Sequence, residues 1–98
     1  MKTIKDLFIE EQSYIVEHKL NDKYYLWIEV FHEYGNAQRF DERILLGNVI
    51  VELHSYDFDD SICEWDYEDF NVDTTLEHLE KVAKYAIEQY ENEQGDEE

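Results

Sequence analysis

The chain has 98 residues and a net charge of −18, because 26 acidic residues stand against 8 basic ones. Its 43% hydrophobic and 15% aromatic content argues against intrinsic disorder and favours one folded domain with its own core. The charge disfavours direct binding to DNA, RNA or anionic membranes, and the single Cys63 excludes an internal disulfide framework.

The first half of the chain predicts a short helix followed by two strands. Thr3 and Asp6 have the spacing of a helix cap, and apolar residues at helical spacing predict a helix over residues 3–11. From residue 14 to residue 20 the pattern alternates, which predicts a strand, and Asn21-Asp22 predicts a tight turn.

The second strand begins at Lys23 and is apolar on both faces, with Tyr25, Trp27 and Phe31 on the second face. Such a strand is expected to be central and covered on both sides, or to form an interface with half of its surface. A polar connection over 36–43 then leads to a third strand over 44–54, which Gly47-Asn48 interrupts.

A fourth strand is predicted over about 62–70, and Thr74 or Thr75 then begins a long helix whose apolar residues recur at helical spacing as far as Tyr90. The sequence thus predicts an α+β fold: a short N-terminal helix, an antiparallel sheet of about four strands, and a long C-terminal helix packed on the sheet. Residues 1–90 form a single acidic domain, and residues 91–98 form a frayed acidic tail.

The most unusual feature is a run of 37 residues between Arg43 and Lys81 that contains 11 acids and no lysine or arginine. Residues 1–51 carry a charge of −3 and residues 52–98 carry −15. Elsewhere acids have bases at helical spacing, as with Glu80 and Lys84. Eight acids fall within 17 residues: Asp57, Asp59, Asp60, Glu64, Asp66, Glu68, Asp69 and Asp73. A one-signed field of this size predicts a basic partner.

An extended conformation over residues 62–68 would place Glu64, Asp66 and Glu68 on one face, about 6.6 Å apart. We expect this carboxylate ladder to imitate a phosphate backbone and to pair with the arginines of a basic groove. A solvated strand face that only confers solubility is the structural alternative.

Aromatic residues are interleaved with these acids and offer anchors of the type found at interface hot spots. Trp65 and Tyr67 are expected in the core. Tyr56 and Phe58 are expected on a loop that reaches a partner, where aromatic rings can also accept arginine side chains.

Other chemistry has little support in the sequence. A calcium loop over 57–68 has Ile62 where glycine is required, the four histidines are scattered, and the acidic neighbours of Cys63 would raise its thiol pKa. No nucleophile elbow, phosphate loop or zinc helix motif occurs. We expect no enzyme activity, no catalytic residues, no cofactor and no metal.

In charge and size the chain resembles small phage or mobile-element proteins that disable host nucleic-acid enzymes by imitating DNA, such as anti-restriction, anti-CRISPR and uracil-glycosylase-inhibitor proteins. The resemblance implies an inhibitor that occupies the groove of a basic nucleic-acid-binding protein, a nuclease, in the cytoplasm of a bacterial host. Two alternatives stay open: an immunity protein that neutralises a toxin nuclease, and a homodimeric structural or adaptor protein that associates through its second strand.

Overall fold

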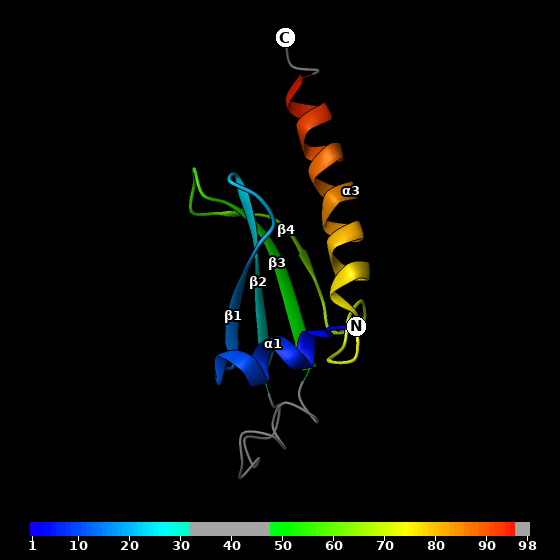
Figure 1. Ribbon diagram of the computed structural model, residues 1–98. Coiled ribbons are helices and arrows are strands. Elements are labelled where there is room, and N and C mark those ends of the chain that lie inside the picture. Colours follow the sequence, from blue (N-terminus) through cyan, green and yellow to red (C-terminus); the bar gives the residue numbers. More distant parts are fainter. Residues whose placement is uncertain (32–47, 96–98) are drawn as a thin grey trace.

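The computed structural model describes residues 1–31 and 48–95 (Figure 1). Its helices and strands form an α+β fold with one antiparallel sheet, which confirms the predicted fold class. The elements in chain order are α1 (Ile4–Glu11), β1 (Ile15–Lys19), β2 (Tyr24–Phe31), β3 (Asn48–Ser55), β4 (Ser61–Trp65) and α3 (Leu76–Gly95). The predicted connection over 36–43 and the predicted strand residues 44–47 lie outside the described residues.

Helix α1 begins with the predicted cap. The Thr3 N–H donates to Asp6 Oδ2 at 2.8 Å, and the Asp6 N–H donates to Thr3 Oγ1 at 3.4 Å. The bond from the Thr3 backbone lowers the pKa of Asp6 below its usual value. Gln12 then ends the helix in a left-handed conformation with φ of 50°.

The four strands follow one another in the sheet, in the order β1-β2-β3-β4, and each neighbouring pair is antiparallel. Asn21 makes the first turn, because its Oδ1 accepts from the backbone N–H groups of Lys23 and Tyr24 at 2.8 and 3.0 Å. Strand β2 lies inside the sheet, as its apolar sequence predicts, while β1 and β4 are the edges.

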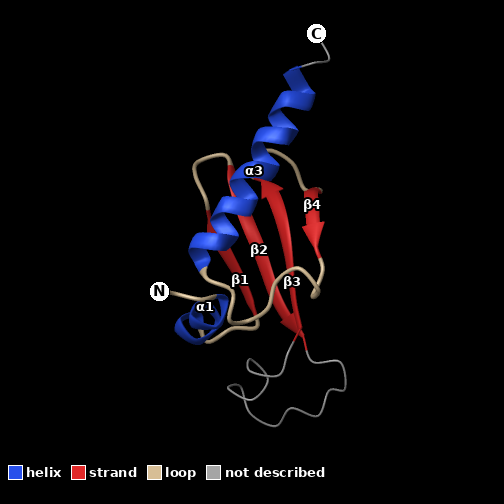
Figure 2. Cartoon of the chain, turned by 90° about the vertical axis from the view of Figure 1, so that its right-hand side faces the viewer, coloured by secondary structure: helices blue, strands red, loops and turns tan. Residues whose placement is uncertain are grey.

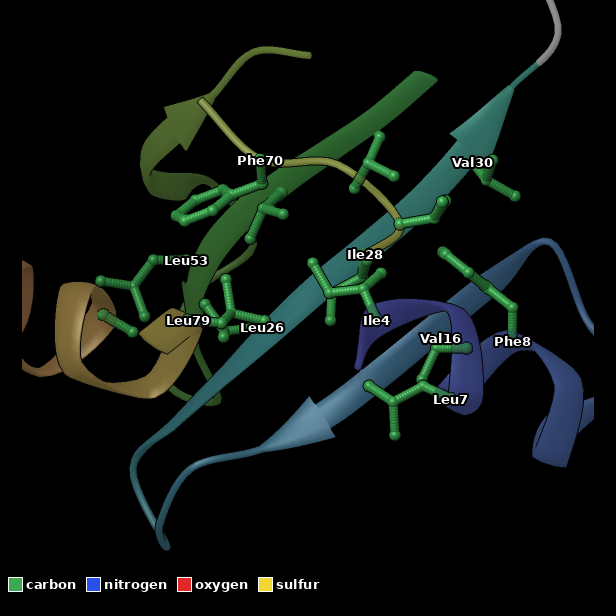
Figure 3. Close-up of a cluster of buried hydrophobic side chains, with 14 of the residues drawn as sticks. Ile4, Leu7, Phe8, Val16, Leu26, Ile28, Val30, Leu53, Phe70 and Leu79 are labelled. Carbon is green, nitrogen blue, oxygen red and sulfur yellow. The ribbon is translucent and has the colours of Figure 1, made fainter. Parts of the chain in front are cut away.

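One face of the sheet carries the core, and both helices pack on that face (Figures 1 and 2). Figure 3 shows how residues from helices and strands meet there, with Phe8 of α1 and Leu79 of α3 against the sheet. The buried members of β2 alternate along the strand: Tyr24, Leu26, Ile28 and Val30. No described helix covers the opposite face, which we call the open face.

Helix α3 begins at the end of the sheet where α1 lies (Figure 1). Thr75, one of the two predicted caps, accepts from the His78 N–H at 3.2 Å through Oγ1. The helix continues as far as Gly95, through most of the segment in which the sequence predicts a frayed tail. None of the described helices combines the length and the apolar composition that a membrane span requires.

The segments at the starts of the two helices are joined by backbone hydrogen bonds. The N–H groups of Ile4 and Lys5 donate to the carbonyls of Thr74 and Val72, at 2.9 and 2.8 Å, and the Leu76 N–H donates to the Lys2 carbonyl at 2.9 Å. The first N–H groups of a helix have no partner inside it, so these bonds satisfy donors that α1 and α3 leave open.

The predicted fourth strand over 62–70 is wrong beyond Trp65, where β4 ends. Residues 66–69 form a turn in which the Asp69 N–H donates to the Asp66 carbonyl at 2.9 Å. The Asp66 N–H in return donates to Asp69 Oδ2 at 3.1 Å. Aspartate side chains offer the backbone this alternative to strand pairing, which is why the strand stops here.

Candidate functional site

The eight clustered acids are all exposed, and the structure divides them among three places on and beside the edge strand β4. The hairpin loop, residues 56–60 between β3 and β4, carries Asp57, Asp59 and Asp60. Glu64 lies in β4 itself. The β4–α3 loop, residues 66–75, carries Asp66, Glu68, Asp69 and Asp73. The two loops lie at opposite ends of β4 (Figure 1), roughly 16 Å apart for a strand of this length.

The predicted ladder of Glu64, Asp66 and Glu68 is therefore not formed. Only Glu64 belongs to a strand, and the other two acids follow the end of β4. A period of two requires an extended backbone at every position, and the turn at Asp66 removes it. The acids near β4 form two separate clusters with Glu64 between them.

These acids have few counter-charges among the described residues. Asp73 lies 3.6 Å from Lys5 Nζ, and none of the other seven makes an ion pair within residues 1–31 and 48–95. Two further lysines pair with other acids, Lys2 with Glu10 at 2.8 Å and Lys19 with Asp22 at 3.3 Å. Glu80 pairs with His18 at 3.0 Å rather than with the expected Lys84. The one-signed field predicted from the sequence is thus present in the described structure.

A second group of carboxylates crosses the open face from strand to strand. In the register of the sheet, Glu17 of β1 is opposite Trp27 of β2, Trp27 is opposite Glu52 of β3, and Glu52 is opposite Glu64 of β4. Directly opposite residues share a face, so Glu17, Glu52 and Glu64 form a row in which Trp27 lies between Glu17 and Glu52. We call these three residues the glutamate row. The row spans three strand spacings, roughly 15 Å.

Sequence analysis missed Glu17 and Glu52, although both stand at alternating positions of predicted strands. Alternation places each residue on a face, but only the pairing register aligns residues of different strands into a row.

Like charges directly opposite in a sheet are destabilising, by about 0.2–1 kcal/mol. We expect the substitution Glu64→Lys to raise the melting temperature by roughly 2–8 °C, because it converts the Glu64–Glu52 repulsion into an attraction. The variant Glu68→Lys, with the same charge change on an exposed turn, is the control. Equal shifts for both variants, measured by circular dichroism, would assign the effect to net charge rather than to the cross-strand pair.

Of the four aromatic residues whose places were predicted, three lie where expected and one does not. Tyr56 and Phe58 are exposed on the hairpin loop as expected, at 53% and 41%. Trp65 packs against the core, with its ring centroid 5.8 Å from that of Phe70. Tyr67 was expected in the core but is 55% exposed, because it follows the end of β4 and lies in the turn.

The hairpin loop lies beside the second half of α3. The ring of Phe58 is 6.5 Å from that of Tyr90, centroid to centroid. Burial raises the pKa of Tyr24, and the nearby carboxylates of Glu91 and Asp57 raise it further. Glu91 of α3 and Asp57 of the hairpin loop thus lie near the same tyrosine, a proximity that sequence spacing did not reveal.

Groups with reactive or metal-binding chemistry are not gathered into a site in the described structure. Cys63 is half-buried, and burial, rather than its acidic neighbours, raises the pKa of its thiol and disfavours the thiolate. Among residues 1–31 and 48–95, no three histidine, cysteine or acidic side chains are placed to hold a metal ion. A cavity of about 450 Å³ between the β1–β2 turn and α3 is lined by both signs of charge, including Lys19, Glu80 and Lys84.

Comparisons with known protein families, with curated proteins and with solved structures found no match to this chain. The candidate site therefore stands on its own geometry: two exposed acidic loops at the ends of an edge strand, and a glutamate row on the open face.

Proposed function

We propose that this protein is a stoichiometric inhibitor that imitates DNA and occupies the basic nucleic-acid-binding groove of a host defence nuclease. The observation that carries the proposal is the exposed set of acids along β4, of which only Asp73 has an ion-pair partner among the described residues. A folded domain that keeps such a set uncompensated gains a strong attraction to a basic partner and faster electrostatically steered association.

The spacing of the two acidic loops supports the proposal. Their separation along β4, roughly 16 Å, is of the same order as the width of the DNA major groove, about 12 Å. Arginine binds carboxylates in the same bidentate manner as phosphates, so a groove that holds a DNA backbone has the chemistry to hold both loops. In this proposal the protein acts in the cytoplasm by binding alone and performs no catalysis.

The test is capture from a bacterial lysate on the immobilised protein, with and without excess duplex DNA. We expect a nuclease to be retained, and DNA to displace it. The triple variant Asp60→Lys, Asp66→Lys and Glu68→Lys should lose the capture, because it reverses charge on both loops. These side chains make no hydrogen bond or ion pair within the described residues, so the fold should persist.

The matched control reverses three exposed acids that belong to the helices and not to the two loops: Glu11→Lys, Glu77→Lys and Glu88→Lys. It makes the same change in net charge, so loss of capture by both variants would show that total charge, not the loops, binds the target. A nuclease that stays bound under excess DNA would instead favour the immunity-protein alternative, in which the contact lies outside the nucleic-acid groove.

A further inference from the structure

The open face carries an aromatic stack at the end of the sheet near the hairpin loop. The ring of Tyr25 lies 5.3 Å from that of His54, centroid to centroid, with only 13° between their planes. Tyr56 lies 4.7 Å from Tyr25 on another side, and Trp27 lies 6.4 Å from His54. Aromatic rings on a sheet face that no described helix covers are unusual, because such rings normally contribute to a core.

Carboxylates surround this stack. The glutamate row crosses the sheet at Trp27, which is two residues from Tyr25 along β2. Burial raises the pKa of Tyr25, and the charges of Glu17, Asp59 and Glu52 add to the rise. Acids from β1, β3 and the hairpin loop therefore act on one tyrosine hydroxyl, which marks this part of the open face as strongly negative.

One polar group in the stack has no partner. His54 is 9% exposed, and its Nε2 lies 2.8 Å from Glu52 Oε1, whereas its Nδ1 is buried without a hydrogen-bond partner in the described structure. An ionised carboxylate only accepts, so Nε2 carries the proton of that bond and a neutral His54 presents Nδ1 as an acceptor without a donor. Buried polar atoms without partners are rare in proteins and call for a physical explanation.

We propose that the open face is a docking surface for an arginine-bearing segment of a partner protein. A guanidinium plane stacks on the exposed Tyr56 ring of the aromatic stack, while its N–H groups donate to carboxylates of the glutamate row. His54 Nδ1 is itself buried, so it is not part of this contact. Lysine complements the negative charge of this surface, but its ammonium group has neither the flat face nor the forked N–H donors of a guanidinium.

A second copy of this chain is a poor occupant of the same face. Two open faces in contact would oppose two glutamate rows, and each chain carries a net charge of −18. Lys19, at the end of β1, already lies 3.3 Å from Asp22. The inference shares Tyr56 and Glu64 with the surface of the proposed function, and it goes beyond that function because it does not require the partner to bind nucleic acid.

The test compares a blocked, fluorescently labelled hexa-arginine peptide with a hexa-lysine peptide of equal charge, by anisotropy in 150 mM NaCl. We expect the arginine peptide to bind about fivefold more tightly, the effect of one cation–π contact of about 1 kcal/mol. The variant Tyr56→Ala should lose most of this preference and leave lysine-peptide binding nearly unchanged. Tyr85→Ala, which removes another exposed tyrosine, on α3, should keep the preference.

Equal binding of the two peptides to the unaltered protein would overturn the inference, as would an unchanged preference in Tyr56→Ala. If that variant does not fold, Glu17→Gln tests the same surface through an exposed member of the glutamate row and should also reduce the preference. A dimer in light scattering that Tyr56→Ala abolishes would assign the face to self-association and likewise overturn the inference. Lysate capture that fails while the arginine preference persists would count against the proposed function alone.

Discussion

Replacing Phe8 with alanine is expected to destabilise the protein by about 3–5 kcal/mol, which is a large share of the roughly 5–15 kcal/mol that stabilises a typical domain. Phe8 is fully buried and lies in α1, an eight-residue helix that is too short to be stable alone. Its ring joins α1 to the sheet (Figure 3), so truncation leaves a cavity and also releases the helix. Urea unfolding followed by circular dichroism measures the loss.

The neighbouring residue supplies the control for this experiment. Ile9 belongs to the same helix but is 43% exposed, so Ile9→Ala should change the free energy of unfolding by less than about 1 kcal/mol. Similar losses for the two variants would mean that α1 is held by its helical tendency rather than by its packing on the sheet.

The melting temperature should rise by roughly 5–10 °C when NaCl increases from 10 to 300 mM at neutral pH. Salt shortens the range of the repulsion among the acids, from about 30 Å at 10 mM to about 8 Å at 150 mM. For a domain of this size, this shift in melting temperature corresponds to an increase on the order of 1–2 kcal/mol in the free energy of unfolding. The effect follows from a net charge of −18 with few ion pairs in the described structure.

The same titration near pH 4.3, the isoelectric point calculated from the sequence, separates repulsion from other actions of salt. There the net charge is close to zero, so the salt effect should nearly vanish. A melting temperature that falls with salt at neutral pH would show that attractive ion pairs outweigh the repulsion, contrary to the proposed role of the acids.

Sequence patterns predicted helices and strands correctly where the spacing of apolar residues reflects the burial of one face of the element. The alternation in β2 and the helical spacing in α3 arise directly from burial on one face, so both elements are confirmed. The capping residues Thr3 and Thr75 were also predictable, because a cap depends on neighbouring residues alone.

The features that escaped prediction depend on contacts between distant segments or on competing local bonds. Residues 62–68 alternate as a strand would, yet from Asp66 onward the Asp69 carboxylate and the Asp66 backbone form a turn instead. The glutamate row requires the register of four strands, which no single strand specifies. The candidate binding residues were therefore predicted as acids, while their arrangement came from the structure.

The hydrogen bonds that join the starts of α1 and α3 also set an order of events during synthesis. Residues 2–5 exchange backbone bonds with residues 72–76, so α1 lacks these partners until about seventy more residues have been added to the growing chain. At about 5–20 residues per second this delay lasts roughly 4–14 s. During that interval the apolar side of α1 has no completed core to enter.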